Sequence, residues 1–305
     1  MTRTKTRLPR KKFISSFLIR ERNEAISQNL TRANQERALV IRKLLQMGKE
    51  VVLSIRKEIS PKERKLVESL RKVKGGKLRI ISFAEDSIYS QTWIRDSFTK
   101  IGKKRILNSI KVEDLGIITS KESRLFGEGG RVINCGKING EKILLISQSQ
   151  LSTKYGFDKN TQRVIEDEIK MLRKRGYTVY SLPGGMFRPK PKNPHENFFH
   201  HLDVFVNHIS GTNILLADSA YYSQNKIYFE KMKGLKVVLV PESERYFYPA
   251  NFLNIGNKEV ILEKRAKKTA ELLRRRGIKV YMTPSSLKRN IENYGGIRCF
   301  VNELP

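Results

Sequence analysis

The apolar residues of the chain alternate between helical and strand-like spacing. Over residues 21–45 they recur as on one face of a helix, and residues 51–55 form an apolar run typical of a strand. Ser60 followed by Pro61 predicts the start of a second helix, because serine caps a helix and proline suits its first turn. A glycine pair predicts the end of this helix, and residues 78–83 predict the next strand.

Further along the chain, one pattern occurs three times at intervals of about 50 residues. Each copy predicts a strand, a turn rich in Asn or Gly, a second strand, a helix that ends at a glycine, and a third strand. The copies lie near residues 142–181, 204–240 and 252–282. Repeated units of this kind predict an α/β fold with pseudo-symmetric radial packing and argue against a doubly wound sheet.

The sequence gives weak signals for a cofactor. No glycine-rich phosphate-binding loop stands between a predicted strand and a predicted helix. The histidines His195, His200, His201 and His208 lack the spacing of metal ligands. We therefore expect neither a nucleotide cofactor nor a metal.

Charge is the most unusual property of the composition. The net charge is +31, and such a field attracts polyanions. An association with nucleic acid or a ribosome therefore stays open, although the same cations also fit solvated helix faces. The most basic stretch, residues 1–20, is expected to be a flexible tail before a single domain at residues 21–305.

Cysteine content and hydropathy point to a compartment. The chain has 2 cysteines, outside any metal-binding or disulfide-scaffold spacing, which suits a reducing cytoplasm. With 39% hydrophobic residues it can form a buried core, but no run approaches the roughly 20 apolar residues of a membrane span. We expect a cytoplasmic protein without a membrane partner.

Four polar clusters stand at the ends of predicted apolar elements. They are Arg95-Asp96, Glu128-Gly129-Gly130, His201-Leu202-Asp203 and Gly295-Gly296-Ile297-Arg298-Cys299. The pair His201 and Asp203 is expected to open a strand, with both side chains on one face. Taken singly, each cluster also fits a structural role, such as a surface ion pair, a tight turn, a strand edge or a buried cysteine. Taken together, they offer a thiol nucleophile, a base and carboxylates.

In this order the clusters resemble those of the guanidino-group-modifying superfamily, which includes arginine deiminase, agmatine deiminase, dimethylarginine dimethylaminohydrolase and the amidinotransferases. The resemblance spans about residues 51–304, and the stretch 251–304 looks most like the end of an arginine deiminase. It implies the pentein fold, a five-bladed α/β propeller built from repeated ββαβ units. In one departure, Arg131 follows Glu-Gly-Gly where arginine deiminases commonly have Asp.

The resemblance implies a catalytic role for each cluster. Cys299 would be the nucleophile, His201 the acid and base, and Glu128 the residue that orients His201, while Asp96 and Asp203 would hold the substrate guanidinium. The implied reaction is hydrolysis to a ureido product and ammonia through a covalent thiouronium intermediate. An incoming amine in place of water would give amidino transfer at the same site. The alternative is a non-enzymatic basic propeller that binds nucleic acid or a ribosome.

The substrate and its far end stay open. A small guanidino compound or an arginine-containing conjugate fits the implied chemistry, and an anionic conjugate fits the charge of the chain best. Four arginines are candidates for binding a substrate carboxylate, namely Arg124, Arg131, Arg188 and Arg298. The Gly- and Pro-rich loop at residues 184–199 is a candidate lid. The oligomeric state is not predicted.

Overall fold

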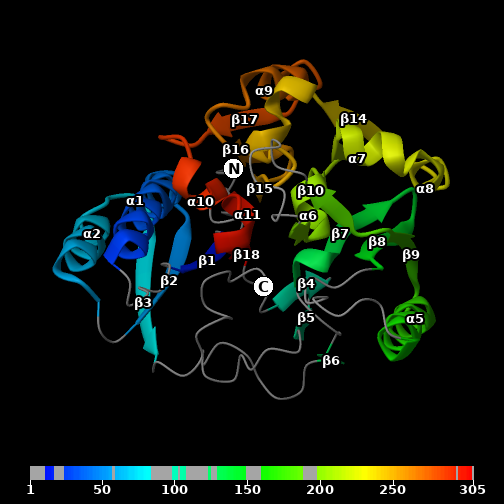
Figure 1. Cartoon of the computed structure of the whole chain (residues 1–305), viewed down its shortest axis with the longest axis horizontal. Coiled ribbons are helices and arrows are strands. Elements are labelled where there is room, and N and C mark those ends of the chain that lie inside the picture. Colours follow the sequence, from blue (N-terminus) through cyan, green and yellow to red (C-terminus); the bar gives the residue numbers. More distant parts are fainter. Residues whose placement is uncertain are drawn as a thin grey trace, which may run out of the picture.

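The computed structural model describes residues 11–16, 24–56, 59–83, 98–101, 104–107, 123–124, 129–148, 159–187, 198–292 and 295–303. Within these ranges the chain forms an α/β fold with mixed sheets, as the sequence predicts. Figure 1 shows the sheets arranged around the middle of the molecule, with helices α2, α5, α8 and α9 at its periphery.

Four three-stranded sheets share one pattern in the described part of the chain, an antiparallel pair followed by a parallel pair. Their strands are β4 (Phe98–Ile101), β5 (Lys104–Leu107) and β6 (Ser123–Arg124); β7 (Val132–Ile138), β8 (Glu141–Ser147) and β9 (Tyr177–Leu182); β12 (Val206–His208), β13 (Ile214–Asp218) and β14 (Lys236–Val240); and β15 (Leu253–Gly256), β16 (Glu259–Leu262) and β17 (Lys279–Met282). The parallel crossovers carry α5 (Lys159–Lys174), α7 (Ser219–Gln224) with α8 (Lys226–Phe229), and α9 (Lys267–Arg274). The three predicted copies of the repeat are therefore confirmed as ββαβ units.

The fifth sheet joins the two ends of the chain in the order β18-β1-β2-β3. Its strands are β1 (Lys12–Ser16), β2 (Glu50–Arg56), β3 (Lys77–Phe83) and β18 (Val301–Glu303), and helices α1 (Glu24–Gln46) and α2 (Pro61–Arg71) belong to the same region. Ser60 caps α2 as predicted: its hydroxyl accepts a hydrogen bond from Glu63 N, while the Glu63 carboxylate accepts one from Ser60 N.

Strand β1 lies within the N-terminal segment that the sequence predicts to be a flexible tail. The sequence places residues 12–16 inside a basic tail, but the structure pairs β1 with both β2 and β18, and Phe13 is fully buried. The physical reason is the burial of Phe13, which removes its apolar side chain from water while Lys12 stays about half exposed. Residues 1–10 lie outside the described residues.

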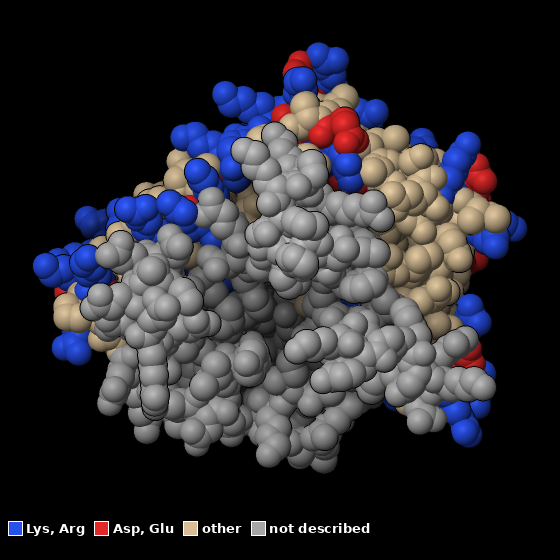
Figure 2. All heavy atoms as spheres, in the orientation of Figure 1, with Lys and Arg blue, Asp and Glu red and all other residues tan. Residues whose placement is uncertain are grey.

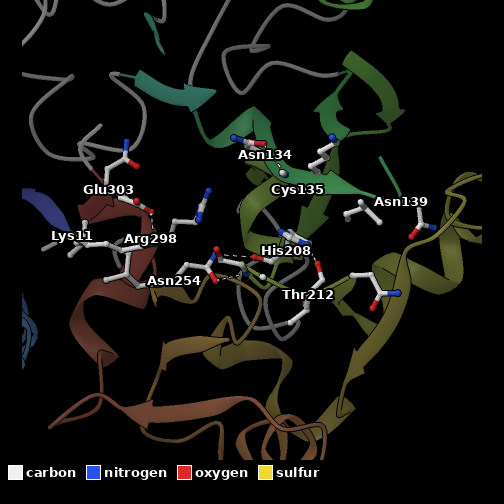
Figure 3. A pocket seen from close by; sticks show the side chains of 18 residues that line it. Lys11, Asn134, Cys135, Asn139, His208, Thr212, Asn254, Arg298 and Glu303 are labelled. Carbon is white, nitrogen blue, oxygen red and sulfur yellow. Dashed lines mark hydrogen bonds and ion pairs between the residues drawn. The ribbon is translucent and has the colours of Figure 1, made fainter. Parts of the chain in front are cut away.

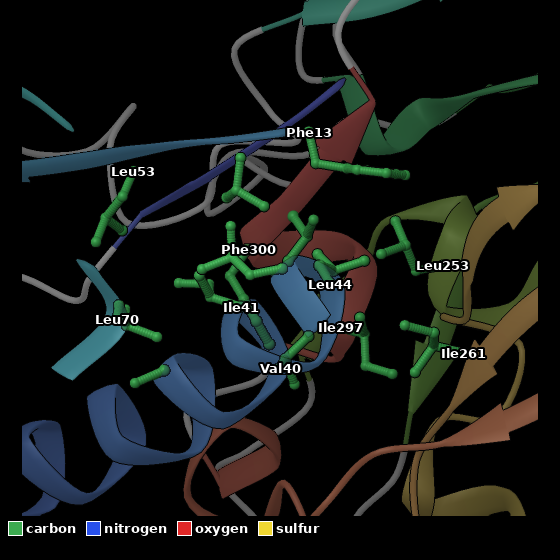
Figure 4. Packing of buried hydrophobic residues seen from close by; sticks show 14 of the residues in the cluster. Phe13, Val40, Ile41, Leu44, Leu53, Leu70, Leu253, Ile261, Ile297 and Phe300 are labelled. Carbon is green, nitrogen blue, oxygen red and sulfur yellow. The ribbon is translucent and has the colours of Figure 1, made fainter. Parts of the chain in front are cut away.

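One hydrophobic cluster connects α1 and the fifth sheet to the C-terminal segment. It contains Phe13, Ile41, Leu44 and Leu53, together with Phe300 from the short helix α11 (Ile297–Phe300). Figure 4 shows Phe300 and Ile297 among the side chains of α1 and β2. The turn that carries Cys299 is therefore held in place by core packing.

None of the described helices is long and apolar enough to cross a membrane.

Candidate active site

Three of the predicted clusters lie immediately before a first strand of a sheet. The 3-10 turn η2 (Gly129–Arg131) precedes β7, helix α6 (Leu202–Phe205) precedes β12, and α11 precedes β18. Helix α6 also packs against η2 and β7. The fold therefore brings segments that are far apart in sequence to the same end of neighbouring strands, near the middle of Figure 1.

Cys299 lies in α11 and is 6% exposed. Its Sγ is 3.6 Å from Oδ1 of Asn251, and the same oxygen accepts a hydrogen bond of 2.9 Å from the backbone N of Arg298. A methyl group at position 296 would lie 2.5 Å from Asn251 Oδ1, so this close approach requires a glycine at Gly296. The second glycine of the motif is thus explained by packing against Asn251.

Asp203 is fully buried in the first turn of α6. Its carbonyl oxygen accepts a hydrogen bond of 3.2 Å from Nδ2 of Asn251, and its Oδ2 lies 3.4 Å from Nε of Arg298. Burial lowers the pKa of Arg298, and the charge of Asp203 opposes that shift. A buried carboxylate needs such a cation nearby. The contacts of Asn251 and Arg298 with Asp203 therefore connect the turn that carries Asp203 to the turn that carries Cys299.

His201 is the residue that begins α6, where a strand was predicted. That prediction is wrong because residues 202–205 close a helical turn, with Val204 N donating to His201 O, and the strand starts only at Val206. The His201 ring packs against Gly130, where a methyl group would lie 2.5 Å from the ring carbon Cγ. The last glycine of Glu-Gly-Gly therefore lets the ring approach the backbone of η2.

Arg131 does not reach the site. It is 1% exposed, and its Nη2 donates to Oε2 of Glu168 on α5 and to the carbonyl of Ser147, both at 3.2 Å. The departure from the deiminase motif thus supplies a buried ion pair between η2 and α5. Arg131 is removed from the candidates for a substrate carboxylate.

A buried arginine that the motifs do not reveal packs against Phe300 of α11. Arg37 of α1 is fully buried, its Cζ is 4.8 Å from the centre of the Phe300 ring, and its Nε donates to Asn290 Oδ1 at 2.8 Å. Burial lowers the pKa of Arg37 to about 9, while the charges of Cys299 and Glu36 oppose the shift. The sequence could have indicated that Arg37 is buried, since Arg37 interrupts the apolar face of a predicted helix.

Two of the predicted site residues, Asp96 and Glu128, lie outside the described residues, as does Arg188. Across the part of the chain that is described, no group of three or more His, Cys, Asp or Glu side chains could hold a metal ion.

Solved structures with a similar fold include enzymes named for guanidino chemistry. A cysteine-to-serine mutant of DDAH from Pseudomonas aeruginosa, complexed with citrulline, matches over 96% of this chain and 99% of that chain, with a TM-score of 0.55 and 15% identity. A putative agmatine deiminase matches over 97% and 93%, with a TM-score of 0.59 and 15% identity. SxtG, an amidinotransferase of the saxitoxin biosynthetic pathway from Microseira wollei, matches over 80% and 82%, with a TM-score of 0.52 and 12% identity.

These likenesses show that the chain shares the fold of these solved structures, as the resemblance in its sequence implied. No protein-family model matches the chain, and no curated protein matches it by sequence.

Proposed function

We propose that this protein modifies guanidino groups through a covalent intermediate on Cys299, most simply as an arginine deiminase-like hydrolase. The observation that carries the proposal is the link through Asn251, whose side chain contacts Cys299 Sγ and the Asp203 backbone at once. Through this link the turns of Cys299 and Asp203 adjoin, which supports the roles of nucleophile and guanidinium-binding carboxylate that we propose for them. His201, the proposed acid and base, packs against Gly130, which belongs to the same Glu-Gly-Gly motif as Glu128.

The chemistry follows from the properties of a guanidinium. Asp96 and Asp203 would pair with its nitrogens and hold the planar cation in place. The thiolate of Cys299 attacks the central carbon, and His201, oriented by Glu128, protonates the departing amine. His201 then takes a proton from water, which attacks the thiouronium carbon. Collapse of that adduct expels the thiolate and leaves a ureido product, with ammonia as the other product.

Arg298 has a supporting role in this scheme. Its Nε lies 3.4 Å from Oδ2 of the fully buried Asp203, so it supplies the cation that a buried carboxylate needs nearby. Hydrolysis and amidino transfer differ only in whether water or an amine resolves the intermediate. We favour hydrolysis.

We further propose that the fold is a five-bladed propeller formed as one domain. Its blades would be the β18-β1-β2-β3 sheet and the four three-stranded sheets.

The proposal is tested by incubating the protein with arginine, agmatine, methylarginines and arginyl peptides, followed by a colour assay for ureido groups. Cys299→Ala should abolish product formation and the covalent adduct seen by mass spectrometry. Cys135→Ala is the matched control, because Cys135 is the other buried free thiol and its burial raises its pKa. This control should keep full activity.

Turnover that survives Cys299→Ala would contradict the mechanism. Product that forms only when glycine or another amine is supplied would assign amidino transfer in place of hydrolysis. Inactivity on every guanidino compound, combined with salt-sensitive RNA binding, would favour the non-enzymatic alternative.

A further inference from the structure

A polar pocket lies between the later residues of β7 and β12, strand β18 and Arg298 of α11. Its volume is about 630 Å³, and its walls include Lys11, Asn134, His208, Arg298 and Glu303 (Figure 3). The candidate catalytic turns come before β7, β12 and β18, whereas the pocket is lined by the later residues of β7 and β12 with the turns that follow them, by the whole of β18 and by Arg298 of α11. The pocket therefore lies at the far ends of β7 and β12 from the candidate catalytic turns and extends along β18 to Arg298, the neighbour of Cys299.

Arg298 is the residue that links the pocket to the candidate active site. Its Nε lies 3.4 Å from Asp203 Oδ2, and its side chain also lines the pocket, where it is 16% exposed. Nε is buried and forms no hydrogen bond with any described residue. In Figure 3 the end of the Arg298 side chain points into the space between Glu303 and His208. The terminal amino groups of an arginine are a planar pair of donors of the kind that binds an oxyanion.

The other charges of the pocket also favour an anion. Lys11 contributes a second cation, whose Nζ is 3.1 Å from Glu303 Oε2 with both side chains partly exposed. His208 contributes no charge near neutral pH, because burial lowers its pKa to about 4. Its Nε2 lies 2.8 Å from the carbonyl oxygen of Thr212, and a neutral ring must donate there. Among the described residues that line the pocket, Glu303 is the one carboxylate, against the cations Lys11, Lys137 and Arg298.

We propose that this pocket binds a small oxyanion, a carboxylate or a phosphate group, between Arg298 and Lys11. The anion would displace Glu303 from Lys11 and share the Arg298 guanidinium with Asp203. Because the bound anion offsets the positive charge of Arg298, the potential at Asp203 becomes more negative. The second step of the inference rests on the proposed function: an occupied pocket should tighten the binding of a cationic guanidino substrate at Asp203 and lower its KM.

Binding is measured first, without any turnover, by titration calorimetry with inorganic phosphate and with acetate at constant ionic strength. We expect saturable binding of at least one of them, and the stronger ligand identifies the class. Lys11→Met should weaken this binding about tenfold, since a charge-assisted hydrogen bond is lost. Glu303→Gln should strengthen it several-fold, because the competing carboxylate is removed.

The outer surface offers a matched control. Lys279 forms a comparable pair with Glu259, at 3.3 Å, on β17 and β16 outside the pocket. Lys279→Met lowers the net charge by the same amount as Lys11→Met and should leave the affinity unchanged. Equal weakening in both variants would assign the binding to the general field of the protein and overturn the pocket. The absence of binding by both anions at millimolar concentration would also overturn it.

The coupling is tested separately, by measuring the KM of a turned-over guanidino substrate with and without the bound anion. A several-fold lower KM that disappears in Lys11→Met supports it, and an unchanged KM at saturating anion overturns the coupling. If no guanidino substrate is turned over at all, the proposed function fails while the calorimetric result for the pocket still stands.

Discussion

The environment of Cys299 is built by single residues that come from distant parts of the chain. Asn251 approaches the sulfur from before β15, and Arg37 reaches the neighbouring Phe300 from α1. The motif residues could be predicted because His, Asp, Glu, Gly and Cys stand in short, recognisable groups. Asn251 could not, since it becomes part of the site only through tertiary packing, and the interrupted apolar stripe marks Arg37 as unusual without linking it to Cys299.

The buried cation of Arg37 should favour the thiolate form of Cys299. Replacing Arg37 with Met removes the charge and keeps a long apolar side chain beside Phe300. We expect the pH midpoint for alkylation of Cys299 to rise by roughly one unit or more. The measurement is the rate of iodoacetamide modification against pH, in a Cys135→Ala background so that a single thiol reports.

Two described cations interact with the charge of Cys299, Arg37 on α1 and Arg298 on α11, so the effect of Arg37 must be separated from that of Arg298. The carboxylates of Glu36 on α1, Asp203 on α6 and Glu303 on β18 act on these two cations. Arg37→Lys keeps the charge and should leave the midpoint close to that of the unsubstituted chain. If Arg37→Met also leaves the midpoint unchanged while the variant stays folded, Arg37 has only a packing role.

At the scale of elements, periodicity predicted the long helices and the apolar strands correctly. It failed where tertiary contacts decide the structure. Residues 201–205 have the composition of a strand but close a helical turn, and the basic segment 12–16 becomes a strand because two others pair with it. The candidate lid contains a short ribbon, in which β10 (Gly185–Phe187) pairs with β11 (Phe198–His200) and leads directly to His201.

The ion pair between Arg131 and Glu168 should hold α5 against its sheet. Both side chains are buried, at 1% and 5% exposed. We expect Arg131→Met to lower the free energy of unfolding by about 3–5 kcal/mol, because it leaves the Glu168 charge buried without this partner. The double variant Arg131→Met with Glu168→Met should recover much of that loss. Chemical denaturation of all four proteins measures the coupling.

The same variants test the assignment of Arg131 as structural. Since its side chain faces α5, the KM of a guanidino substrate should not change in any variant that stays folded. A KM that rises about tenfold in Arg131→Met, but not in Glu168→Met, would instead place Arg131 at the carboxylate of the substrate.

At the scale of the whole molecule, the charge is spread over the outer helices. Exposed cations gather on α2 and its end (Lys62, Arg64, Lys65, Arg71, Lys72, Lys74) and on α9 and its flanks (Lys264, Lys267, Lys268, Arg274, Arg275, Arg276, Lys279). Figure 2 shows Lys and Arg around much of the described outer surface, with fewer Asp and Glu. This spread fits solvated helix faces, and the matching solved structures add no support for a nucleic-acid partner.

The net charge of +31 nevertheless has a consequence for the proposed reaction. A free cationic substrate such as agmatine is repelled at long range, whereas an anionic arginine conjugate is attracted. Salt screens both effects, with a Debye length of about 8 Å at physiological ionic strength.

Raising the salt concentration should therefore increase kcat/KM for agmatine and decrease it for the anionic conjugate, with most of the change in KM. Steady-state kinetics on both substrates at low and high salt provide the measurement, and the unfolding midpoint at each salt concentration controls for changes in stability. If kcat/KM for both substrates is the same at every salt concentration, the pocket itself is shielded from the surface charge, and the preference for an anionic conjugate is wrong.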